Sequence, residues 1–236
     1  MVKARGFYPI LDLDLALARG LDPVALVSGL AALREQARGP ASLASSSRIP
    51  LVQLRAKRLP AGEFLRHAQA AVAAAEELSV IVNDRLDVAQ LSGAAGLHLG
   101  QTDLPPAAAR RLLGAGRVLG YSTHSLAQAQ EALAAPGLEL SYLAIGPIFP
   151  TRSKPDHDPI VGLDAIRQIR RHYAGPLVAI GGITCELAPS VWAAGADAVA
   201  VIGGWLDAPD PLARAREYML AFDRFCSQSD RESGSA

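Results

Sequence analysis

Polar and charged residues stand directly after several short apolar runs of this chain, and their types suit phosphate chemistry. Two carboxylates, Asp84 and Asp103, follow neighbouring runs and could share one Mg2+ ion, which takes oxygen ligands and keeps several waters. Arg55, Lys57 and Lys154 follow other runs and could donate to an anion beside that metal. Such a set suits a diphosphate, which it would stabilise as a leaving group through fixed electrostatics.

Short apolar runs that alternate with longer amphipathic runs must position these side chains. Most of the short runs are continuously hydrophobic, as is typical of parallel strands covered on both faces. The longer runs, such as 64–78 and 164–173, carry apolar residues at helical spacing. The predicted strands are 7–11, 49–54, 80–82, 96–99, 118–121, 142–145, 177–180 and 198–202.

Eight strands, each followed by a helix, predict an α/β fold with a single (β/α)8 TIM barrel. The alternative is a doubly wound open sheet, which is disfavoured because no Gly-rich dinucleotide fingerprint opens the first helix. We expect residues 1–226 to form the barrel and the small, polar residues 227–236 to form a disordered tail. The Gly-, Ala- and Ser-rich stretch 39–47 is expected to be a flexible insertion.

The overall composition excludes several other classes of protein. With 23 basic and 23 acidic residues the formal net charge is zero, which argues against a general nucleic-acid or membrane-surface binder. The sequence has no apolar run of membrane-spanning length and no signal-peptide pattern, and its two cysteines have no metal or disulfide spacing. We therefore expect a cytoplasmic protein whose partners are small molecules; a homodimer is an open alternative.

Glycine pairs end the last two apolar runs. Barrels often bind phosphate with the loops after strands seven and eight, where Gly181-Gly182 and Gly203-Gly204 stand. Glycine lets backbone N–H groups come close to a phosphate. A phosphate site beside a metal–diphosphate site predicts two phosphorylated substrates.

Six ordered motifs, each at the end of a predicted strand, resemble the thiamine phosphate synthase family. They spread over most of the chain, and their order is far more specific than any one of them. The motifs are Val-Gln-Leu-Arg-Ala-Lys (52–57), Ile-Val-Asn-Asp-Arg-Leu-Asp (81–87), Leu-His-Leu-Gly-Gln-Thr-Asp (97–103), Gly-Tyr-Ser-Thr-His (120–124), Gly-Pro-Ile-Phe-Pro-Thr-Arg-Ser-Lys (146–154) and Ala-Ile-Gly-Gly-Ile-Thr (179–184).

The resemblance implies a Mg2+-dependent transferase on a (β/α)8 barrel. Such an enzyme joins hydroxymethylpyrimidine diphosphate to a thiazole phosphate through a carbocation-like step, giving thiamine phosphate and diphosphate. By this analogy, Asp84 and Asp103 bind Mg2+. The residues that hold the pyrimidine diphosphate would be Gln53, Arg55, Lys57, Asn83, Ser122 and Lys154. Those on the thiazole phosphate side would be Thr151, Arg152, Ser153, Gly181, Gly182, Ile202 and Gly203.

The chain also departs from the family pattern, which leaves alternatives open. Ala56 stands where Glu is usual, and Gly203 stands where Ser is usual. A thiazole tautomerase on a similar barrel would need an acid–base residue such as His124, and a non-catalytic binder of thiamine intermediates would need none. Structural roles are the simpler interpretation for His98, His124 and Cys185. Asp84 and Asp103 could likewise be helix N-caps.

Overall fold

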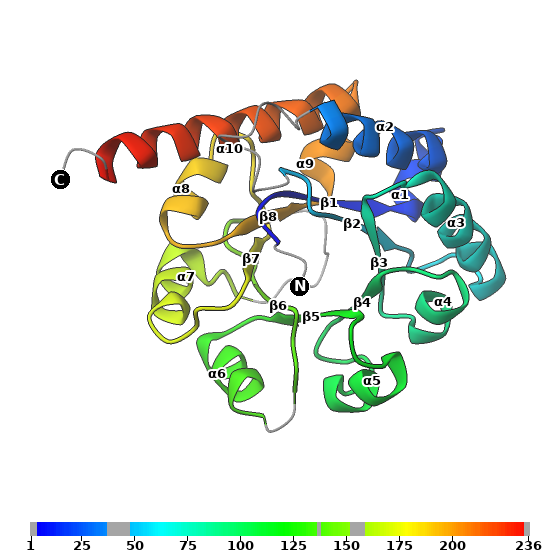
Figure 1. The fold of residues 1–236 in the computed structure, drawn as a ribbon, viewed down its shortest axis with the longest axis horizontal. Helices are drawn as coiled ribbons and strands as arrows, with labels where there is room; N and C mark the ends of the chain where they lie inside the picture. Colours follow the sequence, from blue (N-terminus) through cyan, green and yellow to red (C-terminus); the bar gives the residue numbers. More distant parts are fainter. Residues whose placement is uncertain (1–3, 37–47, 136–137, 152–158, 234–236) are drawn as a thin grey trace.

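Eight parallel strands close into a barrel, which the helices surround (Figure 1). The computed structural model describes residues 4–36, 48–135, 138–151 and 159–233. The strands are β1 Gly6–Asp12, β2 Leu51–Arg55, β3 Ser79–Asn83, β4 Gly96–Leu99, β5 Val118–Thr123, β6 Tyr142–Ile145, β7 Leu177–Ile180 and β8 Ala198–Val201. The prediction of a single (β/α)8 barrel is confirmed.

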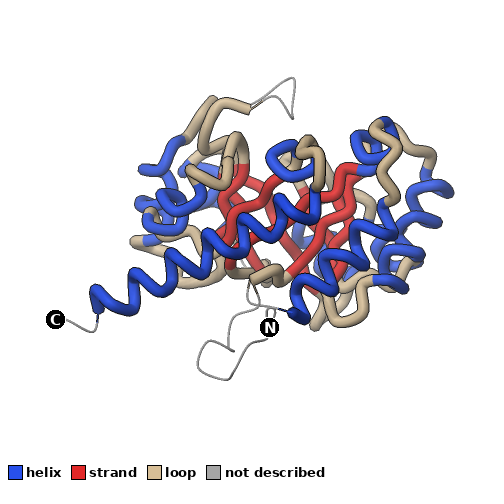
Figure 2. Tube along the Cα trace, turned by 90° about the horizontal axis from the view of Figure 1, so that it is seen from above, coloured by secondary structure: helices blue, strands red, loops and turns tan. Residues whose placement is uncertain are grey.

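Within the described residues, one helix follows each strand, except that two follow β1 and two follow β8. They are α1 Leu13–Ala18, α2 Pro23–Gln36, α3 Ala61–Ala74, α4 Leu86–Leu91, α5 Pro106–Leu113, α6 Leu126–Ala134, α7 Gly162–Arg170, α8 Ala188–Ala193, α9 Gly203–Leu206 and α10 Pro211–Ser233. Figure 2 shows the long α10 lying across the outside of the barrel. No helix in the described part of the chain is long and apolar enough to cross a membrane.

The strands have an inner and an outer face, and both faces are buried. Closure pairs Gly6 of β1 with Ala198 of β8, so the sheet has no free edge. The outer face packs against the helices in the larger core cluster. The inner face contains a smaller cluster that includes Tyr8 and Tyr142. Because both faces are covered, the strands have continuous apolar sequences rather than an alternating pattern.

Some predicted boundaries are wrong by a few residues. The helix expected at 64–78 is α3, which starts after Pro60 and ends at Ala74, and the chain then turns at Glu76 with a φ of 50°. The helix expected at 164–173 is Gly162–Arg170. Such differences arise because helix ends depend on local caps rather than on periodicity.

The C-terminal residues are a further correction. The tail predicted to be disordered from residue 227 continues α10 as far as Ser233. Along this part the hydroxyls of Ser227 and Ser229 donate to the carbonyls of Asp223 and Phe225, four residues earlier. Extending an existing helix needs no new nucleation, so polar residues can continue α10 as helix. The insertion predicted at 39–47 lies outside the described residues.

Candidate active site

A pocket of about 560 Å3 opens at the carboxyl ends of the strands. Residues after every strand from β2 to β8 line it, because parallel strands all end on the same rim. It brings together the described residues that the sequence singled out, namely Gln53, Arg55, Lys57, Asn83, Asp84, Asp103, Ser122, Thr151, Gly181, Gly182, Ile202 and Gly203. The predicted site residues Arg152, Ser153 and Lys154 lie outside the described part of the chain.

Two carboxylates and a lysine form the acidic side of the pocket. Lys57 Nζ lies 2.5 Å from Asp84 Oδ2. Asp103 is held by the Gly100 amide, which donates to its Oδ2 over 2.7 Å. Burial, together with the neighbouring Asp84 carboxyl, raises the pKa of Asp103. The two acidic groups therefore face each other, and their mutual repulsion favours a bound cation.

Neither aspartate caps a helix. The N-cap of α4 is Arg85, and the N-cap of α5 is Pro105. Asp84 instead has a φ of 63°, and its amide donates to the His98 carbonyl over 2.8 Å. A left-handed backbone at a non-glycine residue is a strained arrangement that is often found at functional sites. The geometry therefore favours a site role over capping for both residues.

The acidic pair fits a magnesium ion better than a soft metal. Within the described residues no group of three or more His, Cys, Asp or Glu side chains could hold a metal. Mg2+ is commonly bound by one or two carboxylates, with waters and substrate phosphate oxygens completing its shell. Asp84 and Asp103 would hold it, and it would supply charge stabilisation to a departing diphosphate.

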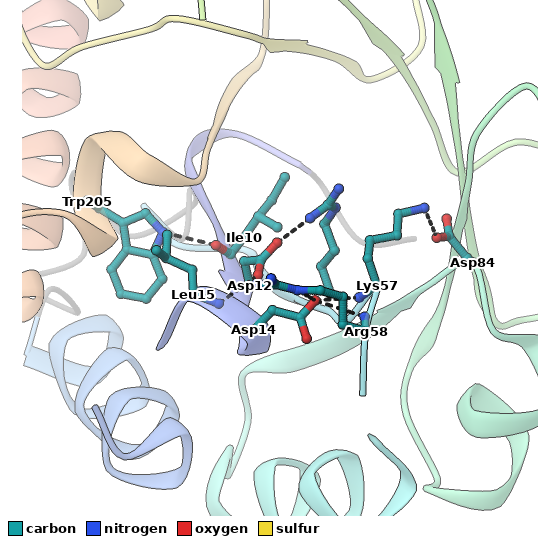
Figure 3. A network of polar contacts seen from close by, with 9 residues as sticks. Ile10, Asp12, Asp14, Leu15, Lys57, Arg58, Asp84 and Trp205 are labelled. Carbon is teal, nitrogen blue, oxygen red and sulfur yellow. Dashed lines mark hydrogen bonds and ion pairs between the residues drawn. The ribbon is translucent and has the colours of Figure 1, made fainter. Parts of the chain in front are cut away.

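Two further aspartates, which the sequence interpretation missed, hold the cations of the β2 rim (Figure 3). Asp12 forms an ion pair with Arg55 and also accepts from the Leu15 amide, so it caps α1. Asp14 accepts from the Lys57 amide at 2.7 Å and from the Arg58 amide at 3.0 Å. The signal was present, because Asp12 directly follows the first apolar run and Asp14 stands two residues later.

The floor of the pocket is polar and buried. Gln53 and Asn83 are 2% and 7% exposed, and His98 is 7% exposed beneath Ser122. His98 Nε2 lies 2.8 Å from Ser122 Oγ, and its Nδ1 lies 2.9 Å from Tyr142 Oη. Burial lowers the pKa of His98 to about 4, so the ring is neutral near pH 7. This confirms the structural interpretation of His98.

Acid should destabilise the protein through His98. Its folded pKa of about 4 lies below the usual 6.5, so below pH 6.5 the unfolded state binds more protons. We expect this residue to contribute of order 3 kcal/mol to the free energy of unfolding, lost as the pH falls from about 6.5 to about 4. Urea unfolding at several pH values would measure it. His98→Gln should flatten this slope and exposed His172→Gln should not; equal slopes in both variants would contradict the assignment.

The opposite side of the pocket is built from backbone. Gly181 and Gly182 have φ angles of 100° and 65°. A Cβ on Gly182 would lie 2.3 Å from the Pro150 carbonyl oxygen, so only glycine fits where this loop meets the β6 loop. Ile202 and Gly203 begin α9, which is held in place because the Trp205 indole donates to the Ile10 carbonyl over 3.2 Å. Exposed amides at such a place can bind phosphate.

A pair of glycine substitutions separates crowding from backbone strain. Gly93 has a φ of 76°, but a Cβ there would meet nothing within 4 Å. We expect Gly93→Ala to cost about 1 kcal/mol of stability from the left-handed backbone alone. Gly182→Ala should cost more, about 3 kcal/mol, and should also weaken phosphate binding because the loop must shift. Thermal unfolding and phosphate titration calorimetry check both; equal costs would contradict the close contact.

Two other candidate groups at the rim do not behave as reactive residues. His124 Nδ1 donates to the Gly146 carbonyl over 2.8 Å, and the His124 amide donates to Gln128, so the ring is fixed to the β6 end. Burial raises the pKa of the Cys185 thiol to about 11, so it is protonated at neutral pH and is a poor nucleophile.

The fold and pocket define a class of protein, a (β/α)8 enzyme with an acidic metal-type site facing a glycine-rich phosphate-type site. The model of the thiamine monophosphate synthase family matches residues 14–204. The chain belongs to this family.

Relatives from bacteria and archaea agree with the family match. A thiamine-phosphate synthase of Koribacter versatilis is 46% identical over 172 residues, which cover 72% of this chain and 79% of that protein. One from Methanocella arvoryzae is 42% identical over 177 residues, which cover 74% and 82%. Both relatives are transferases of thiamine biosynthesis, so the residues of the pocket must be compared with the needs of that reaction.

Solved structures give the same result. A thiamine phosphate pyrophosphorylase from Pyrococcus furiosus superposes with a TM-score of 0.73 at 26% identity, covering 93% of this chain and 96% of that one. A 3-hexulose-6-phosphate synthase superposes with a TM-score of 0.62 at 19% identity, covering 91% and 99%, and this likeness concerns the fold alone.

Proposed function

We propose that this enzyme synthesises thiamine phosphate from hydroxymethylpyrimidine diphosphate and a thiazole phosphate, and releases diphosphate. One observation carries the proposal: the neighbouring carboxylates Asp84 and Asp103, with Lys57 paired to Asp84, share a pocket with the glycine-rich loops of β7 and β8. The pocket, of about 560 Å3, therefore offers two kinds of anion site, one for each phosphorylated ligand.

The pyrimidine diphosphate occupies the β2–β5 side. Arg55 and Lys57 donate to its phosphate oxygens, while Gln53, Asn83 and Ser122 form the polar floor beneath its ring. Asp84 and Asp103 would hold the Mg2+, which would supply charge stabilisation to the departing diphosphate. Lys57, now paired with Asp84, would then be released to donate to the substrate phosphates. The C–O bond to diphosphate then breaks, and the fixed cations stabilise the charge that develops on the leaving group.

The thiazole phosphate occupies the β6–β8 side. The backbone of Gly181, Gly182, Ile202 and Gly203 binds its phosphate, and Thr151 lies beside it. Arg152 and Ser153 remain predicted residues of this side. Lys154 remains a predicted ligand of the diphosphate. The thiazole nitrogen then captures the carbocation-like pyrimidine carbon, a step that needs no general base. The reaction therefore does not need His124 as a base, which agrees with the hydrogen bond of its ring to the Gly146 carbonyl.

The departures from the family pattern are accommodated in this scheme. Gly203 lacks a hydroxyl but keeps the amide that a phosphate needs. Ala56 removes a carboxylate from the rim, where Asp12 and Asp14 already hold Arg55 and the Lys57 backbone. The cytoplasmic location and the homodimer stay predictions.

The decisive experiment mixes the protein with both phosphorylated substrates, with and without Mg2+. We expect thiamine phosphate and diphosphate to appear in equal amounts, only when the metal is present. Conversion of a thiazole phosphate isomer by the protein alone would favour the tautomerase alternative instead. Tight binding of the substrates without any product would favour a non-catalytic binder, and neither alternative is supported by the relatives described above.

A further inference from the structure

Five side chains form a continuous hydrogen-bond chain across the inside of the barrel, below the pocket. Gln53 Nε2 donates to Tyr8 Oη over 3.2 Å, and Tyr8 Oη lies 2.9 Å from Tyr142 Oη. Tyr142 Oη lies 2.9 Å from His98 Nδ1, and His98 Nε2 lies 2.8 Å from Ser122 Oγ. The chain therefore starts and ends at two pocket residues, Gln53 and Ser122, which are connected through three buried groups.

The barrel is shaped around this chain. Tyr8 and Tyr142 are each 1% exposed, and their rings meet edge to face. A Cβ on Gly120 would lie 2.1 Å from Tyr142 Cζ, so the glycine on β5 leaves the space that the phenol fills. The planes of the His98 and Tyr142 rings are 10° apart, and Nδ1 of His98 lies within hydrogen-bond distance of the phenol oxygen.

Each hydroxyl in this series of hydrogen bonds has one hydrogen, so a continuous series can run in one of two directions. In the order that begins with Gln53 Nε2 as the donor, Tyr8 accepts from Gln53 and donates to Tyr142, which donates to Nδ1 of His98. A neutral imidazole whose Nδ1 accepts must hold its hydrogen on Nε2. Nε2 then donates to Ser122, and the hydroxyl hydrogen of Ser122 points to the ligand.

We propose that Tyr8, Tyr142 and His98 are positioning residues that make Ser122 a hydrogen-bond donor and leave the Gln53 carbonyl as an acceptor. The pocket floor would thus select a ligand that has an N–H donor above Gln53 and an acceptor above Ser122. The reverse order of hydrogens would make Ser122 donate to His98, so that it could offer the ligand only a lone pair. The identity of that ligand rests on the proposed function. The direction of the hydrogen bonds from Gln53 to Ser122 does not.

Nitrogen-15 NMR of the ligand-free protein tests the direction, because the two neutral histidine tautomers have different ring-nitrogen shifts. We expect wild-type His98, assigned by its loss in His98→Gln, to carry its hydrogen on Nε2 alone. Tyr142→Phe keeps the ring and removes the hydroxyl, so the other tautomer should become populated. Tyr8→Phe should cause a smaller shift in the same direction. The matched control Tyr173→Phe, at a half-buried tyrosine outside the pocket lining, should cause none.

Steady-state kinetics test the consequence for binding. Tyr142→Phe should raise KM for the pyrimidine diphosphate about tenfold, with a smaller change in kcat and none in KM for the thiazole phosphate. A hydrogen on Nδ1 in the wild type, or an unchanged tautomer and KM in both chain variants, would overturn the proposal. A wild-type protein that makes no thiamine phosphate would contradict the proposed function. The NMR result would still show the direction of the hydrogen bonds from Gln53 to Ser122.

Discussion

Asp84→Asn is expected to lower kcat/KM for thiamine phosphate synthesis by about 10²- to 10³-fold, while the protein stays folded. Asparagine tolerates the left-handed backbone found here, with its φ of 63°, so the substitution removes the charge and keeps the loop. The loss follows because the carboxylate facing Asp103 would no longer hold a cation beside the diphosphate. Initial rates at several Mg2+ concentrations measure the effect, and the variant should need more metal for half-maximal rate.

A nearby aspartate gives the matched control for this substitution. Asp87 lies three residues further on, at the start of α4, and forms an exposed ion pair with Arg85. Asp87→Asn should therefore leave both the rate and the metal dependence unchanged, because exposed pairs contribute little. An Asp84→Asn variant with wild-type rates and wild-type metal dependence would remove the proposed metal site.

Arg55→Gln is expected to lower kcat/KM by about 100-fold and also to destabilise the protein. The guanidinium is 21% exposed at the pocket and is paired with Asp12, whose side chain is 9% exposed. Its removal takes a cation from the diphosphate and leaves a buried carboxylate without its partner. We expect a loss of about 3 kcal/mol in the free energy of unfolding, measured by urea titration.

A double substitution separates the two effects. In Asp12→Asn/Arg55→Gln no buried charge is left unpaired, so the stability should recover while the activity stays low. Arg58→Gln is the control, because that side chain is 80% exposed and lies 3.9 Å from Asp14. If the double variant regained activity along with stability, Arg55 would be a structural residue rather than a ligand of the substrate.

Much of the candidate site could be predicted because the rule that places it is simple. Parallel strands of a barrel end on one rim, so polar residues that directly follow apolar runs must meet there, as Asn83-Asp84, Asp103 and Ser122 do. Asp12, the last residue of β1, and Asp14, two residues later, obey the same rule and were missed because they resemble ordinary helix-capping residues. Their role depends on ion-pair and amide partners at positions 55, 57 and 58, which no local pattern indicates.

The order of the apolar runs predicted the barrel, the polar residues and glycine pairs after them predicted the rim of the site, and six ordered motifs indicated the family, all from the sequence alone. These features are local: the runs follow from hydrophobic periodicity, and the others from the residue types that stand directly beside them. The hydrogen-bond chain from Gln53 to Ser122 was decided only by tertiary structure. Tyr8 and Tyr142 are 134 positions apart and lie on strands whose two faces are both apolar, so nothing in the sequence tells which side chains point inward until the barrel closes.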